Sequence, residues 1–332
     1  MIVSWMTTNR CNLKCSHCYQ DAGACREKEL STEEGKRLID GIARAGFKIM
    51  IFSGGEPLMR DDIFELVQYA AGKGLRPVFG TNGTLIDANT AVRLKQSGAA
   101  SMGISLDSLD AARHDAFRGM EDSWQLTVDA MANCRAAGLN FQIHMTVMDW
   151  NKAEVGDVID FAAKVGADAV YLFFLIPVGR GVYIEDTAVE VLEYEDLLRS
   201  IMAKQREIDI PIKPTCAPQF TRVAQQMGIK LDPRFSRGCL AGLTYCIISP
   251  VGQVRPCAYM TEVAGDIHDA PFDEIWQNSE VFGMLRTQVY GGVCGKCGYK
   301  GVCGGCRARA AYYHDGDILA EDSYCAFGKR LL

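Results

Sequence analysis

The chain has 332 residues, of which 48% are hydrophobic, and its mean hydropathy is close to zero. This length and composition support a large buried core, enough for one large domain and a smaller second one. The formal net charge is −6 and no stretch is rich in lysine or arginine, which argues against nucleic acid as a partner.

The expected compartment follows from the flanks and lengths of the apolar runs and from the cysteine content. The apolar stretch Ile2–Trp5 is not preceded by a charged segment and shows no cleavage site, so we expect no secretion signal. The longest apolar run, residues 169–176, is too short to span a bilayer, so we expect no membrane span. Fourteen cysteines in such a chain indicate metal binding in a reducing cytoplasm rather than disulfides.

The first predicted strand, Ile2–Trp5, is followed by three closely spaced cysteines. Cys11, Cys15 and Cys18 have the spacing Cys-x3-Cys-x2-Cys. Three thiolates on one loop can hold three irons of a cubane 4Fe–4S cluster and leave the fourth iron open, whereas ordinary clusters are closed by four cysteines. The alternative is a zinc site, but zinc sites pair Cys-x2-Cys with a second pair or histidines nearby, and no second pair follows before Cys294.

The second predicted strand, Lys48–Phe52, leads directly into a glycine-rich loop. The loop reads Ser53, Gly54, Gly55, Glu56 and Pro57. Glycines let a backbone approach a ligand closely, and a carboxylate can accept hydrogen bonds from a cationic ammonium group. The position of this loop after the three cysteines indicates a ligand that meets the open iron.

Strand-like and helical patterns alternate through the following residues. Ser31 and Glu34 form a predicted capping box that opens the first helix, which ends near Ala45. The alternation predicts an α/β fold with a parallel sheet and helices outside it. The further predicted strands are Pro77–Gly80, Met102–Leu106, Phe141–Val147 and Ala169–Phe174, and the further predicted helices are Ile63–Lys73, Thr90–Ser97, Trp124–Ala137, Glu154–Val165 and Glu193–Glu207.

Polar residues follow or end several of these strands. They include Asn82, Ser105, Asp107, His144 and Arg180. Ligand sites in parallel α/β barrels lie at the carboxyl ends of the strands, so these residues are candidates for one site. Each also has a plain structural interpretation: Asn82 as part of a turn, Ser105 as a cap, and His144 as a satisfied barrel histidine.

A rigid, extended break at Pro211–Pro214 indicates the end of the first domain. We predict a core domain over residues 1–210, a linker over 211–234 and a cysteine-rich domain over 235–332. The last part holds enough cysteines for two closed cubanes, and zinc is the alternative. Its cysteines are Cys239, Cys246, Cys257, Cys294, Cys297, Cys303, Cys306 and Cys325.

Three cysteines remain outside these groups. Cys134 lies in a predicted helix, where a buried small hydrophobic role is expected. Cys25 has the same interpretation or is an exposed thiol. Cys216 lies at the expected domain junction, where it is a candidate for contact with substrate or a cluster.

The cysteine loop and the Gly54–Pro57 loop together resemble the radical S-adenosylmethionine (SAM) enzymes. The resemblance implies a partial (β/α)6 barrel of the TIM type, in which Cys11, Cys15 and Cys18 hold the catalytic cluster. It implies that SAM binds the open iron and is cleaved to methionine and a 5′-deoxyadenosyl radical. It also implies that SAM is held by the Gly54–Pro57 loop and by Asn82, Ser105, Asp107 and Arg118.

The C-terminal cysteines resemble the SPASM domain, which carries auxiliary 4Fe–4S clusters. The resemblance implies one cluster on Cys239, Cys246, Cys257 and Cys306, and another on Cys294, Cys297, Cys303 and Cys325. A shortened form with one auxiliary cluster is the alternative. The usual pattern has three residues between its last paired cysteines, and this chain has only Gly304 and Gly305.

Three stretches resemble the tetrapyrrole branch of these enzymes: residues 173–181, residues 216–219 with 237–242, and residues 303–310. The resemblance is strongest to the haem synthases, which oxidatively decarboxylate two propionates of Fe-coproporphyrin III to vinyls. It implies a tetrapyrrole substrate and an electron donor such as flavodoxin or ferredoxin. Candidate substrate residues are His144, Arg180, Cys216, Arg237, Arg307 and Arg309, since guanidinium groups pair with carboxylates.

The alternatives are enzymes that share these motifs and one protein of another class. Two sibling enzymes remove acetates from a sirohaem derivative or propionates in haem d1 synthesis. A third alternative is a peptide maturase of the SPASM type. The alternative of another class is a non-catalytic iron–sulfur electron carrier, which has no need of the loop at Gly54–Pro57.

Overall fold

The computed structural model describes residues 1–23 and 28–329, and its central feature is one ten-stranded sheet. The strand order is β10-β9-β8-β1-β2-β3-β4-β5-β6-β7, and every neighbouring pair from β8 to β7 is parallel. The strands are β1 Ile2–Met6, β2 Ile49–Ser53, β3 Arg76–Thr81, β4 Ser101–Ser105, β5 Asn140–Val147, β6 Val170–Phe174, β7 Ile212–Thr215, β8 Tyr245–Ile248, β9 Gln253–Arg255 and β10 Gly265–Asp266.

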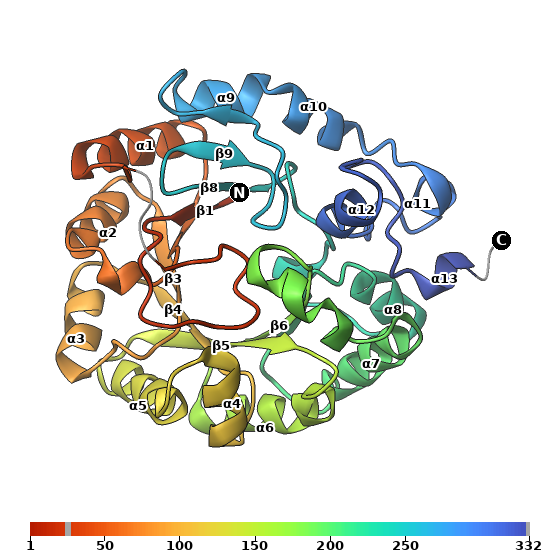
Figure 1. Ribbon diagram of the computed structural model, residues 1–332, viewed down its shortest axis with the longest axis horizontal. Coiled ribbons are helices and arrows are strands. Elements are labelled where there is room, and N and C mark those ends of the chain that lie inside the picture. The colour runs from red at the N-terminus through yellow and green to blue at the C-terminus, as the bar shows by residue number, and fades with distance from the viewer. Residues whose placement is uncertain (24–27, 330–332) are drawn as a thin grey trace.

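The six strands predicted from apolar runs are confirmed as β1 to β6. The curved sheet forms the inner layer of a barrel, and helices surround it (Figure 1). The helices of the barrel are α1 Thr32–Arg44, η1 Pro57–Met59, α2 Ile63–Gly72, α3 Ala88–Gln96, α4 Ala111–Arg118, α5 Ser123–Ala136, η2 Lys152–Glu154, α6 Val155–Val165, η3 Gly179–Thr187 and α7 Val191–Lys204. This is the α/β partial barrel that the sequence predicts.

The main hydrophobic core lies between the strands and the surrounding helices. In β5, Phe141, Ile143 and Met145 are buried in this core, whereas His144 and Thr146 point to the other face of the strand. The alternation therefore places the polar residues of β5 inside the barrel. The predicted capping box is present as well, since Ser31 and Glu34 cap α1 reciprocally.

Residues 211–234, expected to form a linker, contain a strand and a helix that pack on the barrel. Strand β7 pairs with β6, and α8 (Phe220–Gln226) contributes Phe220 and Val223 to the main core. Pro214 lies within β7, which is tolerated because β7 is an edge strand. The domain boundaries remain a prediction, but these residues are structurally part of the barrel.

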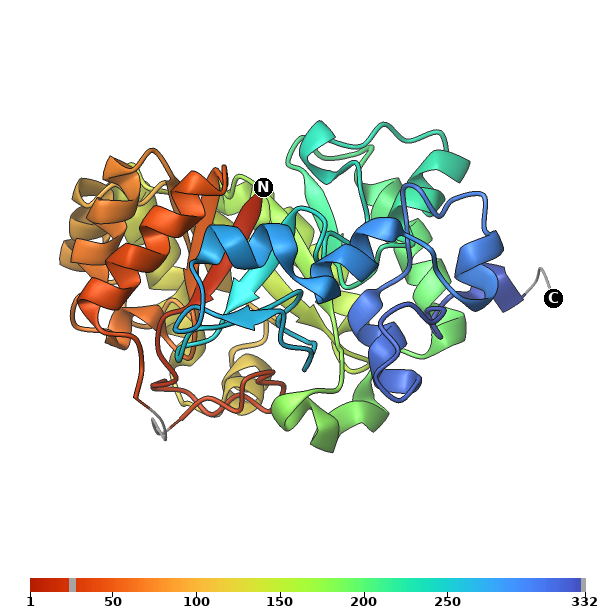
Figure 2. The ribbon, with the colours of Figure 1, turned by 90° about the horizontal axis from the view of Figure 1, so that it is seen from above.

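The cysteine-rich part also extends the sheet. Strand β8 pairs in parallel with β1 and continues antiparallel into β9 and β10. The remaining elements are η4 Pro233–Phe235, α9 Phe272–Asn278, α10 Glu280–Thr287, α11 Gly292–Lys296, α12 Arg307–Tyr313 and α13 Ala326–Lys329. Figure 2 shows this part closing over one side of the barrel. A second, smaller core around α12 contains Cys306, Met260 and Leu285.

Two further properties of the described residues concern the cysteines and the helices. The thirteen cysteines that lie in the described ranges are all free thiols, whereas Cys25 lies outside them. Among the same residues, no helix is both long enough and apolar enough to cross a bilayer.

Candidate active site

The loop with the three cysteines leaves β1 and crosses the mouth of the barrel at the carboxyl ends of the strands (Figure 1). Cys15 is buried, and Cys11 and Cys18 are partly exposed. The backbone N–H of Leu13 donates to the sulfur of Cys11, and that of Ala22 donates to the sulfur of Cys18, each at 3.4 Å. The bond from Leu13 favours the thiolate of Cys11, which is the form that binds metals.

Burial raises the pKa of Cys11 to about 11 and raises that of Cys15 in the same direction. At Cys15 the charge of Arg118 acts against this effect. Iron must therefore displace the protons of Cys11 and Cys15, which couples iron binding to proton release.

The glycine pair holds the cysteine loop in place through direct backbone contact. A Cβ atom on Gly54 would lie 2.4 Å from the carbonyl oxygen of Thr8, and one on Gly55 would lie 2.2 Å from that of Arg10. The N–H groups of Gly55 and Glu56 donate to these two carbonyls at 2.8 Å. The glycines are thus required for the approach of two chain segments.

The carboxylate of Glu56 is fully buried and is used within the protein. It accepts hydrogen bonds from the N–H groups of Leu58 and Asn82 and from the hydroxyl of Thr81. Burial raises the pKa of Glu56 to about 7 despite these bonds. In the described part of the chain, the carbonyl groups of Gly54 and Gly55 accept no hydrogen bond. The expected contact between Glu56 and SAM stays a prediction.

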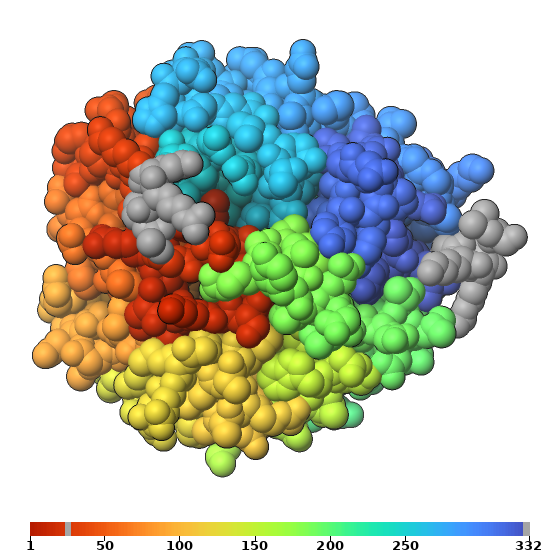
Figure 3. Space-filling model, viewed as in Figure 1, coloured from red at the N-terminus to blue at the C-terminus, as the bar shows by residue number. Residues whose placement is uncertain are grey.

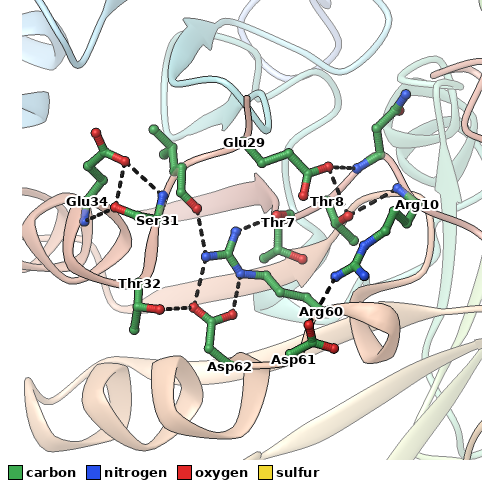
Figure 4. A network of polar contacts seen from close by, with 12 residues as sticks. Thr7, Thr8, Arg10, Glu29, Ser31, Thr32, Glu34, Arg60, Asp61 and Asp62 are labelled. Atoms are coloured by element: carbon green, nitrogen blue, oxygen red, sulfur yellow. Dashed lines mark hydrogen bonds and ion pairs between the residues drawn. The ribbon is translucent and has the colours of Figure 1, made fainter. Parts of the chain in front are cut away.

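An arginine that the sequence analysis missed anchors both ends of the cysteine loop (Figure 4). The guanidinium of Arg60 donates to the carbonyls of Thr7 and Leu30, each at 2.8 Å, and pairs with Asp62 at 2.6 Å. Glu29 accepts from the hydroxyl of Thr8 and from the N–H of Asn9. Together these contacts fix where the loop leaves the barrel and where it returns.

A buried ion pair lies beside Cys15. Arg118, at the end of α4, donates to Asp107 at 2.6 Å and reaches the sulfur of Cys15 at 3.9 Å. Asp107 also accepts from the N–H of Thr146 at 2.8 Å. Burial acts to raise the pKa of Asp107, but the charge and hydrogen bond of Arg118, together with His17 and His114, outweigh it and the pKa is lowered. Asp107 thus stays ionised and orients Arg118 toward the cysteine loop.

Of the other polar residues at the strand ends, Asn82 contacts the cysteine loop and Ser105 faces the barrel interior. The side chain of Asn82 bonds Thr84 and Asn12, so it supports the cysteine loop from β3. The hydroxyl of Ser105 donates to the carbonyl of Thr81 at 3.2 Å and is partly exposed toward the barrel interior. Whether either residue touches SAM stays a prediction.

His144 lies inside the barrel between aromatic rings. Its ring packs against Tyr171 and Phe173, and its Nε2 atom is buried without a partner among the described residues. A Cβ on Gly103 of the neighbouring strand would come within 2.3 Å of the imidazole. Burial lowers the pKa of His144 to about 4, so the ring is neutral at pH 7.

A second group of thiols lies where the barrel meets α12. Cys216, Cys239, Cys257 and Cys306 pack around the same small core. The neighbouring thiol of Cys216 lowers the pKa of Cys306 to about 7, and the pKa of Cys216 itself is raised. Cys216 adopts a left-handed backbone conformation with a φ of 58°, which is uncommon for a residue other than glycine.

Cys246, which was expected in this group, lies elsewhere. It is fully buried on β8, in register with Val3 of β1, and both residues belong to the main core. Successive strand residues point to opposite faces, so Cys246 points away from the barrel interior that Tyr245 and Ile247 face. The structure thus places Cys216 with Cys239, Cys257 and Cys306 and places Cys246 apart from them, and the ligand set of this cluster stays a prediction.

A third group of thiols surrounds a cavity near the C-terminus. Cys294, Cys297, Cys303 and Cys325 line it together with Arg222 and Gly305. The N–H of Tyr299 donates to Cys297, and that of Gly305 donates to Cys303. Four thiols line this one cavity, which is the number that a closed iron–sulfur cluster needs, and their role as its ligands stays a prediction.

The comparisons with known proteins agree with this arrangement. The family model of the radical SAM superfamily matches residues 5–162, and that of the SPASM iron–sulfur cluster-binding domain matches residues 239–307. A protein of Nitratidesulfovibrio vulgaris named AdoMet-dependent heme synthase is 40% identical over 99% of this chain and 93% of its own. The chain belongs to the radical SAM superfamily.

Further relatives come from the same superfamily. A protein of Methanosarcina barkeri, also named AdoMet-dependent heme synthase, is 40% identical over 98% of this chain and 96% of its own. Another protein of that organism, named Fe-coproporphyrin III synthase, is 30% identical over 99% and 88%. The crystal structure of Streptococcus suis SuiB bound to precursor peptide SuiA has a TM-score of 0.78 at 19% identity and covers 98% of this chain and 75% of its own. That likeness concerns the fold.

Membership of the superfamily implies iron–sulfur cofactors. The matched domains imply a SAM-binding 4Fe–4S cluster and auxiliary iron–sulfur clusters. The loop of Cys11, Cys15 and Cys18 offers three thiols, and each of the other two groups offers four. The number of thiols in each set therefore suits these clusters.

Three of the four arginines expected to face substrate carboxylates, Arg180, Arg307 and Arg309, form bonds within this radical SAM enzyme. Arg180 donates to the carbonyls of Cys15 and Ala22 at 2.9 Å, so it secures the cysteine loop from η3. Figure 3 shows the loop and η3 side by side over the mouth of the barrel.

The two arginines of α12 are fully buried. Arg307 donates to the carbonyls of Ile318 and Ala320, and Arg309 pairs with Asp322 and donates to the carbonyl of Cys216 at 2.8 Å. Backbone carbonyls, which no sequence pattern reveals, thus engage donors of Arg180, Arg307 and Arg309, and a contact of these arginines with substrate stays a prediction.

Arg255 is a candidate partner for a substrate carboxylate that the sequence analysis missed. It is opposite Ile247 in the β8–β9 pair, so it lies on the face of the sheet that borders the barrel interior. One of its amino groups donates to Gln253 at 2.6 Å, and its Nε atom is buried without a partner among the described residues. Its place two residues before Cys257 is a signal that could have found it.

Proposed function

We propose that this protein is a haem synthase that oxidatively decarboxylates two propionates of Fe-coproporphyrin III to vinyl groups. The observation that carries the proposal is the 40% identity to proteins named AdoMet-dependent heme synthase over nearly the whole of both chains. The match includes the barrel, the cysteine loop and both C-terminal groups of thiols. The substrate is accordingly a tetrapyrrole.

Cys11, Cys15 and Cys18 would hold the SAM-binding cluster, which supplies the electron that cleaves SAM. The free carbonyls of Gly54 and Gly55 would accept from the amino group of SAM, because backbone carbonyls are good acceptors for an ammonium donor. Arg118, oriented by Asp107, places a positive charge beside the loop, where it would pair with the carboxylate of SAM.

The interior of the barrel would hold the nucleoside part of SAM. The partly exposed hydroxyl of Ser105 and the unpartnered Nε2 of His144 both face this interior. A neutral imidazole can donate or accept one hydrogen bond at Nε2, depending on its tautomer, which suits a ribose hydroxyl. These roles for Ser105 and His144 are part of the proposal.

The substrate carries several carboxylates and needs cationic partners near the mouth. Arg255 would supply one of them through its unpartnered Nε, because a guanidinium pairs well with a carboxylate. Its place near Cys257 would bring the reacting propionate toward the thiols of Cys216, Cys239, Cys257 and Cys306.

The second group of thiols would hold the cluster that receives the surplus electron. Abstraction of a hydrogen atom from the propionate β-carbon is followed by cleavage of the bond to the carboxylate, formation of the vinyl double bond and release of carbon dioxide. One electron is left over in this step. The third group, with Cys294 and Cys325, would hold a second auxiliary cluster.

The compartment and the electron donor complete the proposal. The free thiols of the described cysteines suit a reducing cytoplasm. We propose flavodoxin or ferredoxin as the donor to the SAM-binding cluster. The domain boundaries at residues 210 and 235 are retained as a functional division between the SAM-binding and auxiliary parts.

The test is an anaerobic assay of the reconstituted, reduced protein with SAM and either Fe-coproporphyrin III or a sirohaem-derived substrate, read by mass spectrometry. Two successive losses of carbon dioxide plus two hydrogens from Fe-coproporphyrin III, with 5′-deoxyadenosine formed, would support the proposal. Conversion of only the sirohaem-derived substrate would assign the activity of the sibling enzyme.

A further inference from the structure

Two tyrosine rings touch between the cysteine loop and the second group of thiols. Tyr19 directly follows Cys18, and Tyr259 lies two residues after Cys257. Their ring centroids are 5.2 Å apart and the ring planes are inclined by 55°. The contact therefore joins two segments that are more than two hundred residues apart in sequence and that each carry a thiol proposed to bind a cluster.

The surroundings of the pair link both thiol groups to it. Tyr259 packs against the same small core as Cys216, Cys239 and Cys257. Tyr19 interacts electrostatically with Cys18 and also with Cys257, and Tyr259 interacts with Cys216 and Cys257. Each tyrosine thus lies within electrostatic range of the other segment.

A third tyrosine supports the pair from β8. The hydroxyl of Tyr245 donates to Ser4 at 3.1 Å, and the ring interacts electrostatically with Tyr19 and Cys257. The geometric link between the two segments is the ring contact of Tyr19 and Tyr259 itself.

The proposed reaction both consumes and releases an electron, so a path between the two groups of thiols would be useful. Cleavage of SAM consumes one electron, and formation of a vinyl group with loss of carbon dioxide releases one. The sum of SAM and propionate giving methionine, 5′-deoxyadenosine, vinyl and carbon dioxide is therefore redox-neutral. An electron released at the substrate can serve the next SAM cleavage, provided that it returns from the second group of thiols to the cysteine loop.

We propose that the contact between Tyr19 and Tyr259 is the path by which this electron returns from the auxiliary cluster site of Cys257 to the SAM-binding site of Cys18. The inference rests on the proposed function. Electron tunnelling falls steeply with distance, and packed aromatic rings shorten the gap that it must cross. The rings act as a bridge and are not themselves oxidised, so the hydroxyl groups are not required.

The experiment counts products per electron in the holoenzyme. The protein is reduced photochemically with one electron per molecule, the reductant is removed, and SAM and Fe-coproporphyrin III are added. Mass spectrometry counts vinyl groups, and electron paramagnetic resonance spectroscopy locates the remaining electron. The wild-type protein should form more than one vinyl group per electron supplied.

Variants of the two tyrosines distinguish the return of the electron from SAM cleavage and vinyl formation. Tyr259→Leu and Tyr19→Leu should each form at most one vinyl group per electron, with the electron trapped on an auxiliary cluster. Tyr259→Phe keeps the ring and should match the wild type, as should Tyr183→Leu, which alters a tyrosine that is 84% exposed. Iron content and circular dichroism confirm that each variant is folded and loaded.

Three results would overturn the inference in distinguishable ways. A wild-type protein that forms vinyl groups but at most one per electron has no return of electrons, although the proposed function stands. Leucine variants that match the wild type show that the electron does not use this pair. A wild-type protein that cleaves SAM but forms no vinyl group removes the proposed function itself.

Discussion

Arg118 reaches the sulfur of Cys15 at 3.9 Å while its Nε atom donates to Asp107 at 2.6 Å. The arginine thus lies between a buried carboxylate and a thiol proposed to bind iron. Replacing it by methionine would leave the charge of Asp107 buried without its partner. We expect Arg118→Met to lose about 3–5 kcal/mol of unfolding free energy.

Arg118→Lys is the matched variant, because it keeps the charge but loses the planar donor group. It should remain folded while binding SAM more weakly, as measured by equilibrium dialysis of the reconstituted protein. Unchanged stability of Arg118→Met in chemical denaturation would show that the pair with Asp107 is not a structural one.

The approach of Gly55 to the carbonyl of Arg10 leaves no room for a side chain. Gly55→Ala should therefore displace the cysteine loop, at a cost on the order of 1–3 kcal/mol. It should bind about four irons fewer than the wild type after reconstitution, because one cubane is lost. Gly156→Ala is the control, since nothing lies within 4 Å of a Cβ at that position.

The assignment of Cys216, rather than Cys246, to the second group of thiols is directly testable. Cys216→Ala should lose about four irons and the spectroscopic signal of one auxiliary cluster, while SAM cleavage by the reduced protein persists. Cys246→Ala, which removes a thiol from the main core, should retain the full iron content. The opposite pattern of iron loss would restore the ligand set expected from sequence.

The sequence revealed the strands of the barrel because their apolar runs are long and regular. It did not reveal β7, where Lys213 and Pro214 interrupt the apolar pattern, because only the edge position of this strand tolerates them. The helix α4 was missed as well, since its eight residues carry no clear apolar stripe.

The spacing of the thiols predicted the group of Cys294, Cys297, Cys303 and Cys325, which lie close in the chain. Cys216 was only a candidate, because its place beside Cys306 depends on the path of the chain after β7. The bonds that Arg309 makes within the protein could not be predicted for a similar reason. Sequence shows that Arg309 is a possible partner of a carboxylate, but not that Asp322 already occupies it.

The pH dependence of stability should reflect His114, which is 1% exposed. Its Nδ1 accepts from the N–H of Asp107 at 3.2 Å, and burial lowers its pKa from 6.5 to about 4. The unfolded chain therefore binds a proton below pH 6.5 that the folded protein does not bind until about pH 4. Stability should fall with decreasing pH in this window, by at most about 1.4 kcal/mol per pH unit.

Chemical denaturation of the wild type and of His114→Gln at pH 7 and pH 5 measures this contribution. The variant should show a smaller loss of unfolding free energy between the two values than the wild type. His268→Gln, which alters an exposed histidine, serves as the control. An equal loss in the wild type and in His114→Gln would mean that His114 does not contribute.

Arg255→Ala tests the proposed substrate contact. Loss of one charge-assisted hydrogen bond costs about 1.5–3 kcal/mol, so KM for Fe-coproporphyrin III should rise roughly 10- to 100-fold while KM for SAM stays the same. Arg234→Ala, which removes an exposed arginine of η4, is the control. Equal KM values for the porphyrin in both variants would remove Arg255 from the substrate site.

The measurement that tests the central claim most directly uses Fe-coproporphyrin III with deuterium at the β-carbons of its propionates. The reduced holoenzyme is supplied with SAM, and mass spectrometry follows the porphyrin and 5′-deoxyadenosine together. The account predicts one deuterium transferred to 5′-deoxyadenosine for each vinyl group formed. Vinyl formation without deuterium in 5′-deoxyadenosine, or 5′-deoxyadenosine formed while the porphyrin stays unchanged, would contradict it.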